Sequence, residues 1–328
     1  MTRPSLSIVI ASVAGGDCLF RCLDSLREQA GSSDIEVIVV DRSGETIRRR
    51  LREEYGFVTV MEADPARRQT VPVLRYLGAR RARNEIVAIV EEHKVVPPDW
   101  VKCIRESFQE NDAAVGGPIL DSGYARLSDW VVYFTEYYNH LPSWTSGKRL
   151  RLATANIAYR REDLLKHESV LGSGYWELVL HPLLAAEGKT LRSVPGMAVY
   201  HTAGTVGYSE YLSERYLVSR VYGGSQRRKV SFIKRAIYLA GAPVFSILLL
   251  MRIAHRVLAS GHRVGKFLET IPLMLPVMVA YVWGEWLGYC RGSLPRIGAD
   301  RAADQRGSCR GSARIVPRID ADAAADQR

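Results

Sequence analysis

Two stretches near the start decide the fold: SIVIASVAGGDCLFRCLDSLREQ, residues Ser7 to Gln29, and IEVIVVDRSG, residues Ile35 to Gly44. In each, a short apolar run rich in β-branched residues ends at a polar residue, Ser12 or Asp41. Continuous apolar runs are typical of parallel strands that are buried on both faces. Parallel sheets bind ligands at the carboxyl ends of their strands, so Ser12 and Asp41 are predicted to lie at a ligand-binding edge.

Similar apolar runs occur further along the chain. Strand-like runs alternate with helix-like segments, which predicts βαβ units and an α/β fold with a mostly parallel sheet flanked by helices. The predicted strands are Leu6 to Ala11, Ile35 to Val40, Phe57 to Met61 and Ile86 to Val90, and the predicted helices are Cys18 to Gln29 and Val73 to Arg83. Glu91, Glu92 and His93 directly follow the fourth strand.

Composition narrows the class of protein. The 328 residues are 47% hydrophobic and 24% charged, which excludes a wholly disordered chain. A mean hydropathy of -0.08 excludes a polytopic membrane protein. The net charge of +10 favours acidic partners such as phosphates, nucleotides or anionic lipid. Five scattered cysteines without a C-x-x-C pair, and no signal peptide, fit a reducing cytosolic location.

The middle of the chain has a more mixed pattern. An amphipathic aromatic stretch covers Asp129 to His140, a strand-like run covers Ala153 to Tyr159, and a helix-like segment covers Trp176 to Glu187. We interpret residues 116–225 as the acceptor half of the same domain whose first half is residues 1–115.

The next segment, residues 226–291, combines basic and apolar residues. From Ser225 to Lys266 there are nine basic residues and no acidic one, around the apolar run Ala236 to Met251. A second apolar stretch covers Phe267 to Cys290. Their uncharged cores are shorter than the roughly 20 residues of a straight transmembrane helix. We therefore predict an apolar helical hairpin in contact with a membrane, either crossing it or lying at its surface; two buried core helices are the alternative.

The tail, residues 292–328, contains a repeat. RIGADRAADQR, residues 296–306, and RIDADAAADQR, residues 318–328, are identical at nine of eleven positions. Few large apolar residues occur here, so a disordered tail without a catalytic role is predicted.

Several residues have the chemistry of an active site. Glu91, Glu92 and His93 suit a magnesium or manganese ion, or form a solvated loop. Glu177 is predicted at the start of a helix, with His181 one turn later; it is either a general base or a surface carboxylate at the helix N-terminus. His201 follows a predicted strand, Met197 to Tyr200, as a late metal ligand or a turn residue.

Other charged side chains are candidates for binding the phosphate groups or the remainder of a nucleotide. Arg215, Arg220 and Arg227 alternate with tyrosines and either bind phosphate oxygens or form a basic face against anionic lipid. Asp41 either accepts hydrogen bonds from a nucleotide or caps a turn. Neither G-x-G-x-x-G after the first strand nor a P-loop motif occurs, so a dinucleotide cofactor and a P-loop nucleotide are not supported.

The order of these segments resembles family 2 glycosyltransferases of the GT-A fold. The two opening stretches resemble the family's strand, loop, CL-SL helix and VVD pattern, and TVPVLRYLGARRARNEIVAIVEEHKVVPPDWV resembles the segment that leads into its D-x-D motif, in an acidic-acidic-His variant. The segments GGPILDS, NIAYRREDL, GYWELVLHPLLAAEGKTL and VPGMAVYH follow in the family's order, so the resemblance covers about residues 5–225.

This resemblance implies roles for individual residues. Glu177 would be the catalytic base, Glu91 and His93 would hold a divalent cation, Mg²⁺ or Mn²⁺, and His201 would be a further ligand of it. Contacts to the nucleotide-sugar would come from Ser12, Asp41, Glu92, Asn156 and Arg160. The altered D-x-D puts metal dependence in question and makes Glu92 an alternative ligand.

The implied function is an inverting transfer of a sugar from a nucleotide-sugar, with a uridine diphosphate sugar as the expected donor, to a membrane-linked saccharide or polyprenyl acceptor in cell-surface polysaccharide assembly. The expected location is the cytoplasmic face of a bacterial inner membrane. Two alternatives stay open: a polyprenyl-phosphate glycosyl synthase, and a catalytically inactive membrane adaptor of the same fold. A nucleic-acid partner is not expected, because the basic residues surround apolar runs rather than a polar groove.

Overall fold

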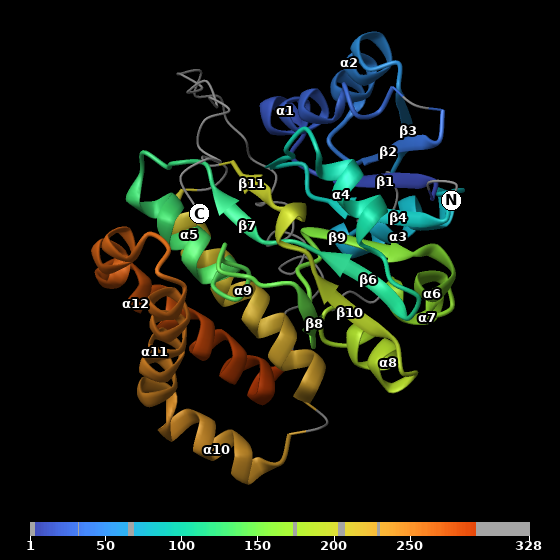
Figure 1. Ribbon diagram of the computed structural model, residues 1–328. Helices are drawn as coiled ribbons and strands as arrows, with labels where there is room; N and C mark the ends of the chain where they lie inside the picture. Colours follow the sequence, from blue (N-terminus) through green and yellow to red (C-terminus); the bar gives the residue numbers. More distant parts are fainter. Residues whose placement is uncertain are drawn as a thin grey trace.

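The computed structural model describes residues 4–31, 33–64, 69–172, 176–202, 207–227 and 230–292. Within them, a large central sheet is flanked by helices on both faces, and a layer of long helices lies against one side of it (Figure 1). The predicted α/β class is confirmed, and the C-terminal apolar helices form the expected hairpin.

The central sheet has the strand order β3-β2-β1-β4-β9-β6-β10-β8 in the described part of the chain. Its strands are β1 (Leu6–Ser12), β2 (Ile35–Asp41), β3 (Val58–Glu62), β4 (Ile86–Val90), β6 (Asp112–Gly116), β8 (Gly147–Arg149), β9 (Asn156–Arg160) and β10 (Thr190–Ser193). Neighbours in the first half, β3 to β4, are parallel, and Ser12 pairs with Asp41 across β1 and β2. The second half is mixed, since β9 runs antiparallel to both β4 and β6.

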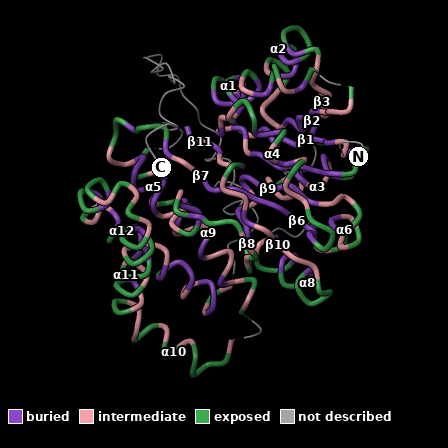
Figure 2. Tube along the Cα trace, in the orientation of Figure 1, coloured by how far each residue is buried: buried purple, intermediate pink, exposed green. Residues whose placement is uncertain are grey.

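The helices of the sheet domain cover its two faces. They are α1 (Gly16–Leu26), α2 (Glu45–Glu54), α3 (Val71–Arg81), α4 (Trp100–Ser107), α5 (Leu127–Tyr137), α6 (Arg161–Leu165), α7 (Glu168–Leu171) and α8 (Leu180–Ala186), with a 3₁₀ turn at Pro195–Met197. Alternate residues of β1 point to opposite faces: Ile8 and Ile10 pack with α1, α4 and α5, and Val9 and Ala11 pack with α3 and α8. The sheet is therefore buried on both faces, as the apolar strands predict (Figure 2).

Predicted and observed elements differ at their ends. The helix predicted from Trp176 begins at Leu180, so Glu177 lies in a turn and not on a helix. The strand predicted from Ala153 begins at Asn156, which leaves Thr154 in the turn before it. The helices α2 and α4 were not predicted, because α2 carries few apolar residues and α4 is only two turns long.

A small second sheet, β5-β11-β7, joins distant parts of the chain. It consists of β5 (Lys94–Val95), β7 (Ile119–Asp121) and β11 (Val199–His201). His201 pairs with Lys94 on one side and with Asp121 on the other. The second sheet therefore carries His201 to the residues that follow β4.

Four helices complete the described chain: α9 (Tyr208–Gln226), α10 (Phe232–Ala240), α11 (Ala242–Ser260) and α12 (Val264–Arg291). The last two are long and apolar enough to cross a membrane, a property that buried core helices share. Ile253 of α11 and Phe267, Met274 and Val277 of α12 belong to the same hydrophobic cluster as the sheet. The helices thus share one core with the sheet domain, and the domain boundary at residue 225 stays a prediction. The predicted disordered tail lies outside the described residues from 293 onward.

Gly117 provides a test of the packing that holds the second sheet in place. A Cβ at Gly117 would lie 1.9 Å from the backbone oxygen of Met197, so the Pro195–Met197 turn would have to move. We expect Gly117→Ala to lower the free energy of unfolding by about 1–3 kcal/mol, measured by urea denaturation. Gly56→Ala is the control, because a Cβ there has no neighbour within 4 Å. Equal urea midpoints for the two variants would contradict this packing.

Candidate active site

A pocket of about 290 Å³ opens at the carboxyl end of β4, between the sheet and the helical layer. It lies next to the predicted ligand-binding edge of the sheet. Its polar lining consists of Arg75, Glu91, Glu92, His93, Glu136, Tyr137, His140, Thr154, Glu177, His201, Tyr211, Glu214 and Arg215.

Glu91 lies at the centre of the polar contacts. Its Oε1 is 2.6 Å from Nη2 of Arg75, and its Oε2 is 3.0 Å from Nε2 of His93 and 3.4 Å from Nζ of Lys94. Burial opposes the ionisation of Glu91, but Lys94, His93 and Arg75 hold its pKa well below the usual value. Glu91 is therefore a carboxylate that balances two buried cations.

Lys94 is fully buried behind Glu91. Its ammonium donates to the hydroxyl of Tyr137 at 2.8 Å, and burial lowers its pKa to about 8. Tyr137 is the last residue of α5, so this hydrogen bond ties the end of the helix to the residues that follow β4.

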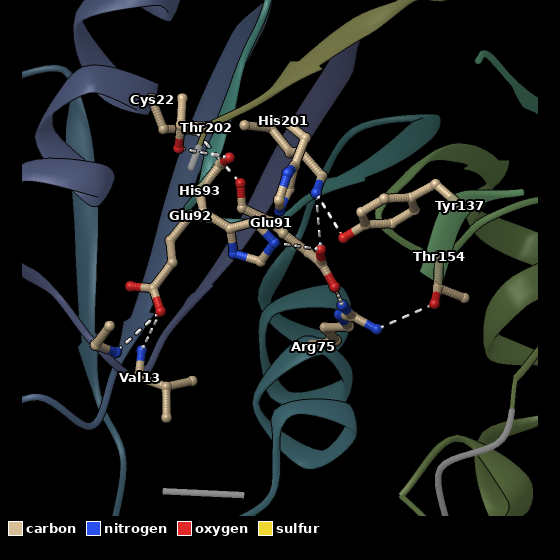
Figure 3. A network of polar contacts seen from close by, with 12 residues as sticks. Val13, Cys22, Arg75, Glu91, Glu92, His93, Tyr137, Thr154, His201 and Thr202 are labelled. Atoms are coloured by element: carbon tan, nitrogen blue, oxygen red, sulfur yellow. Dashed lines mark hydrogen bonds and ion pairs between the residues drawn. The ribbon is translucent and has the colours of Figure 1, made fainter. Parts of the chain in front are cut away.

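Arg75 joins Glu91 to the predicted base. Its Nη1 donates to Oγ1 of Thr154 at 3.2 Å, and Thr154 in turn donates to Oε1 of Glu177 from its backbone N at 2.9 Å and from Oγ1 at 3.1 Å. Figure 3 shows Arg75 between Glu91 and Thr154. The structure thus places Glu177 and Glu91 at one pocket, connected through two residues that the sequence analysis did not identify.

The environment of the Glu177 carboxyl suits a proton acceptor. Burial raises the pKa of its carboxyl, and the two donors from Thr154 and the charge of Arg75 lower it in part. A carboxylate with a raised pKa is a better base at neutral pH than an exposed one.

Glu92 points away from Glu91, toward the loop after β1. Its Oε1 accepts hydrogen bonds from the backbone N of Val13 at 3.1 Å and of Ala14 at 2.9 Å, and its Oε2 accepts one from Gly15 N at 3.0 Å (Figure 3). Burial raises its pKa to about 7, although these three donors oppose the shift. Glu92 therefore fixes the loop after β1 and does not face the same point as Glu91 and His93.

His93 and His201 lie side by side. Their ring centroids are 5.1 Å apart, with the rings nearly perpendicular. Burial and the neighbouring Lys94 lower the pKa of both imidazoles, which keeps both neutral. Nδ1 of His201 is 2.7 Å from the hydroxyl of Tyr124, which also donates to the backbone oxygen of His201 at 3.2 Å. With the proton of His201 on Nδ1, that hydroxyl accepts from Nδ1–H and the Nε2 lone pair is available to a ligand.

These side chains fit a divalent cation by their chemistry. A carboxylate and two neutral imidazoles form a common donor set for transition metals, and a hydrogen bond to the second ring nitrogen orients such ligands. Among the described residues, no three His, Cys, Asp or Glu side chains already stand in a metal-binding arrangement. A cation would have to draw Glu91 and the two histidines together.

Ser12 and Asp41 lie together at the predicted edge, but both are fully buried. Asp41 accepts hydrogen bonds from the backbone N of Ser43 at 3.1 Å and of Gly44 at 3.2 Å, and it pairs with Arg48 at 3.2 Å. Its carboxylate therefore shapes the turn after β2. A direct contact of Asp41 with a nucleotide stays a prediction.

Asn156 and Arg160 are not part of the pocket. The side chain of Asn156 is fully buried, where it accepts from Trp100 Nε1 at 3.1 Å and donates to the backbone oxygen of Met197 at 2.6 Å. Arg160 lies at the other end of β9 and donates to the backbone oxygens of Gln109 and Asp112. Both side chains support the sheet, and their contact with the sugar stays a prediction.

Arg215 and Arg220 of α9, and Arg227 just after it, have separate surroundings. Arg215 lines the pocket, but it is paired with Glu136 at 2.5 Å and with Glu214 at 3.1 Å. Arg220 contacts the hydroxyl of Tyr216 at 3.2 Å, and Arg227 is exposed at the far end of the helix. The binding of phosphate or lipid by these arginines stays a prediction. His181, the neighbour of Glu177 in the sequence prediction, is buried against the Tyr159 hydroxyl at 2.8 Å and packs in the core.

Comparison with known proteins agrees with the fold. Residues 7–167 match the family described as Glycosyl transferase family 2. The glucosyl-dolichyl phosphate glucuronosyltransferase of Haloferax volcanii is 27% identical over 115 residues, which are 34% of this chain and 34% of that protein. The chain therefore matches about a third of the length of this curated relative.

Among solved structures, the mannosyltransferase of Pyrobaculum calidifontis, determined in complex with GDP-mannose and Mn²⁺, is similar with a TM-score of 0.54. The two sequences are 16% identical, and the match covers 88% of each chain. The likeness shows a shared fold. The protein has a GT-A-like fold, and its residues 7–167, just under half of the chain, match Glycosyl transferase family 2.

Proposed function

We propose that the protein is an inverting glycosyltransferase that moves a sugar from a nucleotide-sugar to a hydroxyl of a lipid-linked acceptor. The observation that carries this proposal is the chain of contacts from Glu91 through Arg75 and Thr154 to Glu177 in one pocket. It sets a buried base beside a group of residues suited to a diphosphate. The Haloferax volcanii relative, named as acting on a glucosyl-dolichyl phosphate, supports a lipid-linked acceptor.

The donor is proposed to lie over the carboxyl ends of β1, β2 and β4. Ser12 and Asp41 shape the turns there, and Glu92 fixes the backbone of residues 13–15. Glu91, His93 and His201 are proposed to hold a divalent cation, which would neutralise the negative charge that develops on the departing diphosphate. Arg75 adds a fixed positive charge at the same place.

The reaction is a single displacement. The acceptor hydroxyl oxygen attacks the anomeric carbon of the donor sugar from the face opposite the diphosphate, and Glu177 accepts the hydroxyl proton. The bond from the anomeric carbon to the diphosphate oxygen breaks, and the electron pair leaves with the nucleoside diphosphate. The two Thr154 donors hold the Glu177 carboxylate in one orientation, so the attack follows a fixed line.

The location proposed for this reaction is the cytoplasmic face of a bacterial inner membrane. The basic and apolar helices α10, α11 and α12 support an association with lipid, and the acceptor's lipid would stay in the membrane.

The first test is Glu177→Gln. Glutamine keeps the size of the side chain and its acceptor for Thr154, but it cannot take a proton. We expect kcat to fall by about 100-fold or more while the dissociation constant of the donor stays within about twofold. The assay measures nucleoside diphosphate release from UDP-, GDP- and dTDP-sugars with polyprenyl-linked acceptors in nanodiscs. Glu162→Gln, an exposed residue of α6, is the control.

An equal fall in donor affinity would show that Glu177 binds the donor and is not the base. Full activity of Glu177→Gln would favour a polyprenyl phosphate as the attacking group, since that anion needs no base. Absence of release with every donor, despite membrane binding, would favour the inactive adaptor.

The pH dependence of kcat is a second test. Glu177 must be ionised to accept a proton, and burial raises its pKa, so kcat should fall as the pH drops through this raised value. The groups that face it are Arg75 and Glu91, and Glu91 stays ionised in that range because its pKa is held well below the usual value. A kcat that is flat from pH 8 down to pH 5 would rule out this role.

Cation binding is tested separately from activity. We expect His93→Ala and His201→Ala each to weaken Mn²⁺ binding at least tenfold, measured by calorimetry without substrate. Tyr124→Phe should weaken it about tenfold as well, because it removes the hydrogen bond that orients His201. His167→Ala, on the distant α6–α7 connection, is the control. Unchanged Mn²⁺ affinity in all variants would exclude this cation site.

A further inference from the structure

The turn between α11 and α12 is attached to the sheet domain by a buried carboxylate. Asp121, the last residue of β7, accepts from Nε2 of His262 at 2.8 Å and from Nε and Nη2 of Arg263 at 3.2 and 3.1 Å. Its side chain is 2% exposed. Arg263 has φ 54°, the one positive value at a non-glycine residue in the described chain, so these bonds hold the turn in an otherwise costly conformation.

The rest of α12 is fixed along α9. The backbones of α9 and α12 are in close contact at glycines. A Cβ at Gly223 would lie 2.2 Å from the backbone oxygen of Glu285, and a Cβ at Gly284 would lie 2.3 Å from the backbone oxygen of Tyr216. Tyr208 at the start of α9 donates to the backbone oxygen of Leu273 at 2.7 Å. The hairpin therefore packs along the domain and does not extend away from it (Figure 1).

The outer side of α10 and α11 is exposed (Figure 2), and many of its side chains are apolar. We call it the outer face, defined by Phe232, Ile233, Ile237, Ile247, Leu248 and Met251, which are 51–82% exposed. The basic residues Lys234, Arg252 and Arg256 are exposed beside it, and no acidic residue occurs between Ser225 and Leu268. Apolar side chains edged by cations match the boundary between acyl chains and anionic headgroups.

We propose that the outer face lies in the headgroup and acyl boundary of an anionic bilayer, and that α11 and α12 do not cross it. This inference rests on the proposed membrane association. Crossing would leave one end of the hairpin on the far side. If that end were the turn, the Asp121 contacts would break. If it were the other end, the basic residues 227–235 would have to pass through the bilayer, which is costly.

A second copy of the chain fits the outer face less well than lipid does. In a twofold dimer each surface meets its own copy, so Lys234, Arg252 and Arg256 would face like charges without acidic partners. An anionic bilayer gives these side chains opposite charges.

Labelling of single positions tests the inference. Purified protein is added to sealed vesicles of phosphatidylcholine and phosphatidylglycerol and treated with a membrane-impermeant maleimide. Gly265→Cys marks the turn, where a Cβ meets nothing within 4 Å, and Ser231→Cys, an exposed position among residues 227–235, marks the other end of the hairpin. Peptide mass spectrometry gives the labelling at each position, with Cys103 on α4 as the internal reference.

We expect each position to be labelled equally in intact and permeabilised vesicles. If either one reacted only after permeabilisation, the hairpin would cross and the inference would be wrong. Protein that does not bind the vesicles would overturn the membrane association itself, and dimers without vesicle binding would identify a second copy as the occupant.

The Asp121 contact is tested in solution. We expect Asp121→Asn to increase amide hydrogen exchange in residues 260–266 at least tenfold, because it removes the charge that His262 and Arg263 share. Asp129→Asn, which breaks the Arg126 pair on α5, is the control. Unchanged exchange at the turn would show that Asp121 does not hold it.

Discussion

The pocket depends on the charge balance around Glu91. Arg75 and Lys94 are both buried, and a buried cation without an anion is strongly destabilising. Glu91 is in contact with both, so one carboxylate stabilises helix α3, the end of β4 and the start of β5 together. Lys94 connects Glu91 to Tyr137 of α5, and Arg75 connects Glu91 to Thr154 in the turn before β9. The residues proposed for catalysis are therefore held by a single network.

The reversal of direction at β9 brings the two halves of the site together. Since β9 runs antiparallel to β4, the turn that precedes it, with Thr154, lies at the same edge of the sheet as the residues that follow β4. The parallel pairing of β11 with β7 carries His201 to that edge from a later part of the chain. A sheet with parallel strands alone would place the loops before its strands at the opposite edge.

The apolar strands and the position of Glu91, Glu92 and His93 could be predicted from the sequence, because burial on both faces leaves a clear pattern in each strand. The roles of Arg75, Lys94 and Thr154 could not, since nothing in their neighbours distinguishes them from surface residues. For Asn156 and Arg160 the sequence suggests a functional role, whereas the structure shows supporting contacts. Their polar side chains look functional, but one satisfies buried backbone groups and the other supports strand ends, which only tertiary contacts reveal.

The helical layer gives the proposed acceptor one direction of approach. Tyr211 and Arg215 of α9 line the pocket, while further along the same helix Gly223 touches the backbone of α12. Because α9, α11 and α12 share the hydrophobic core of the sheet, the part of the outer face on α11 is connected to the pocket through one packed core. An acceptor whose lipid stays in the bilayer would reach Glu177 along α9. If the proposed function holds, two properties determine which acceptors are used: the distance from the lipid surface to the pocket, and the contacts within the pocket.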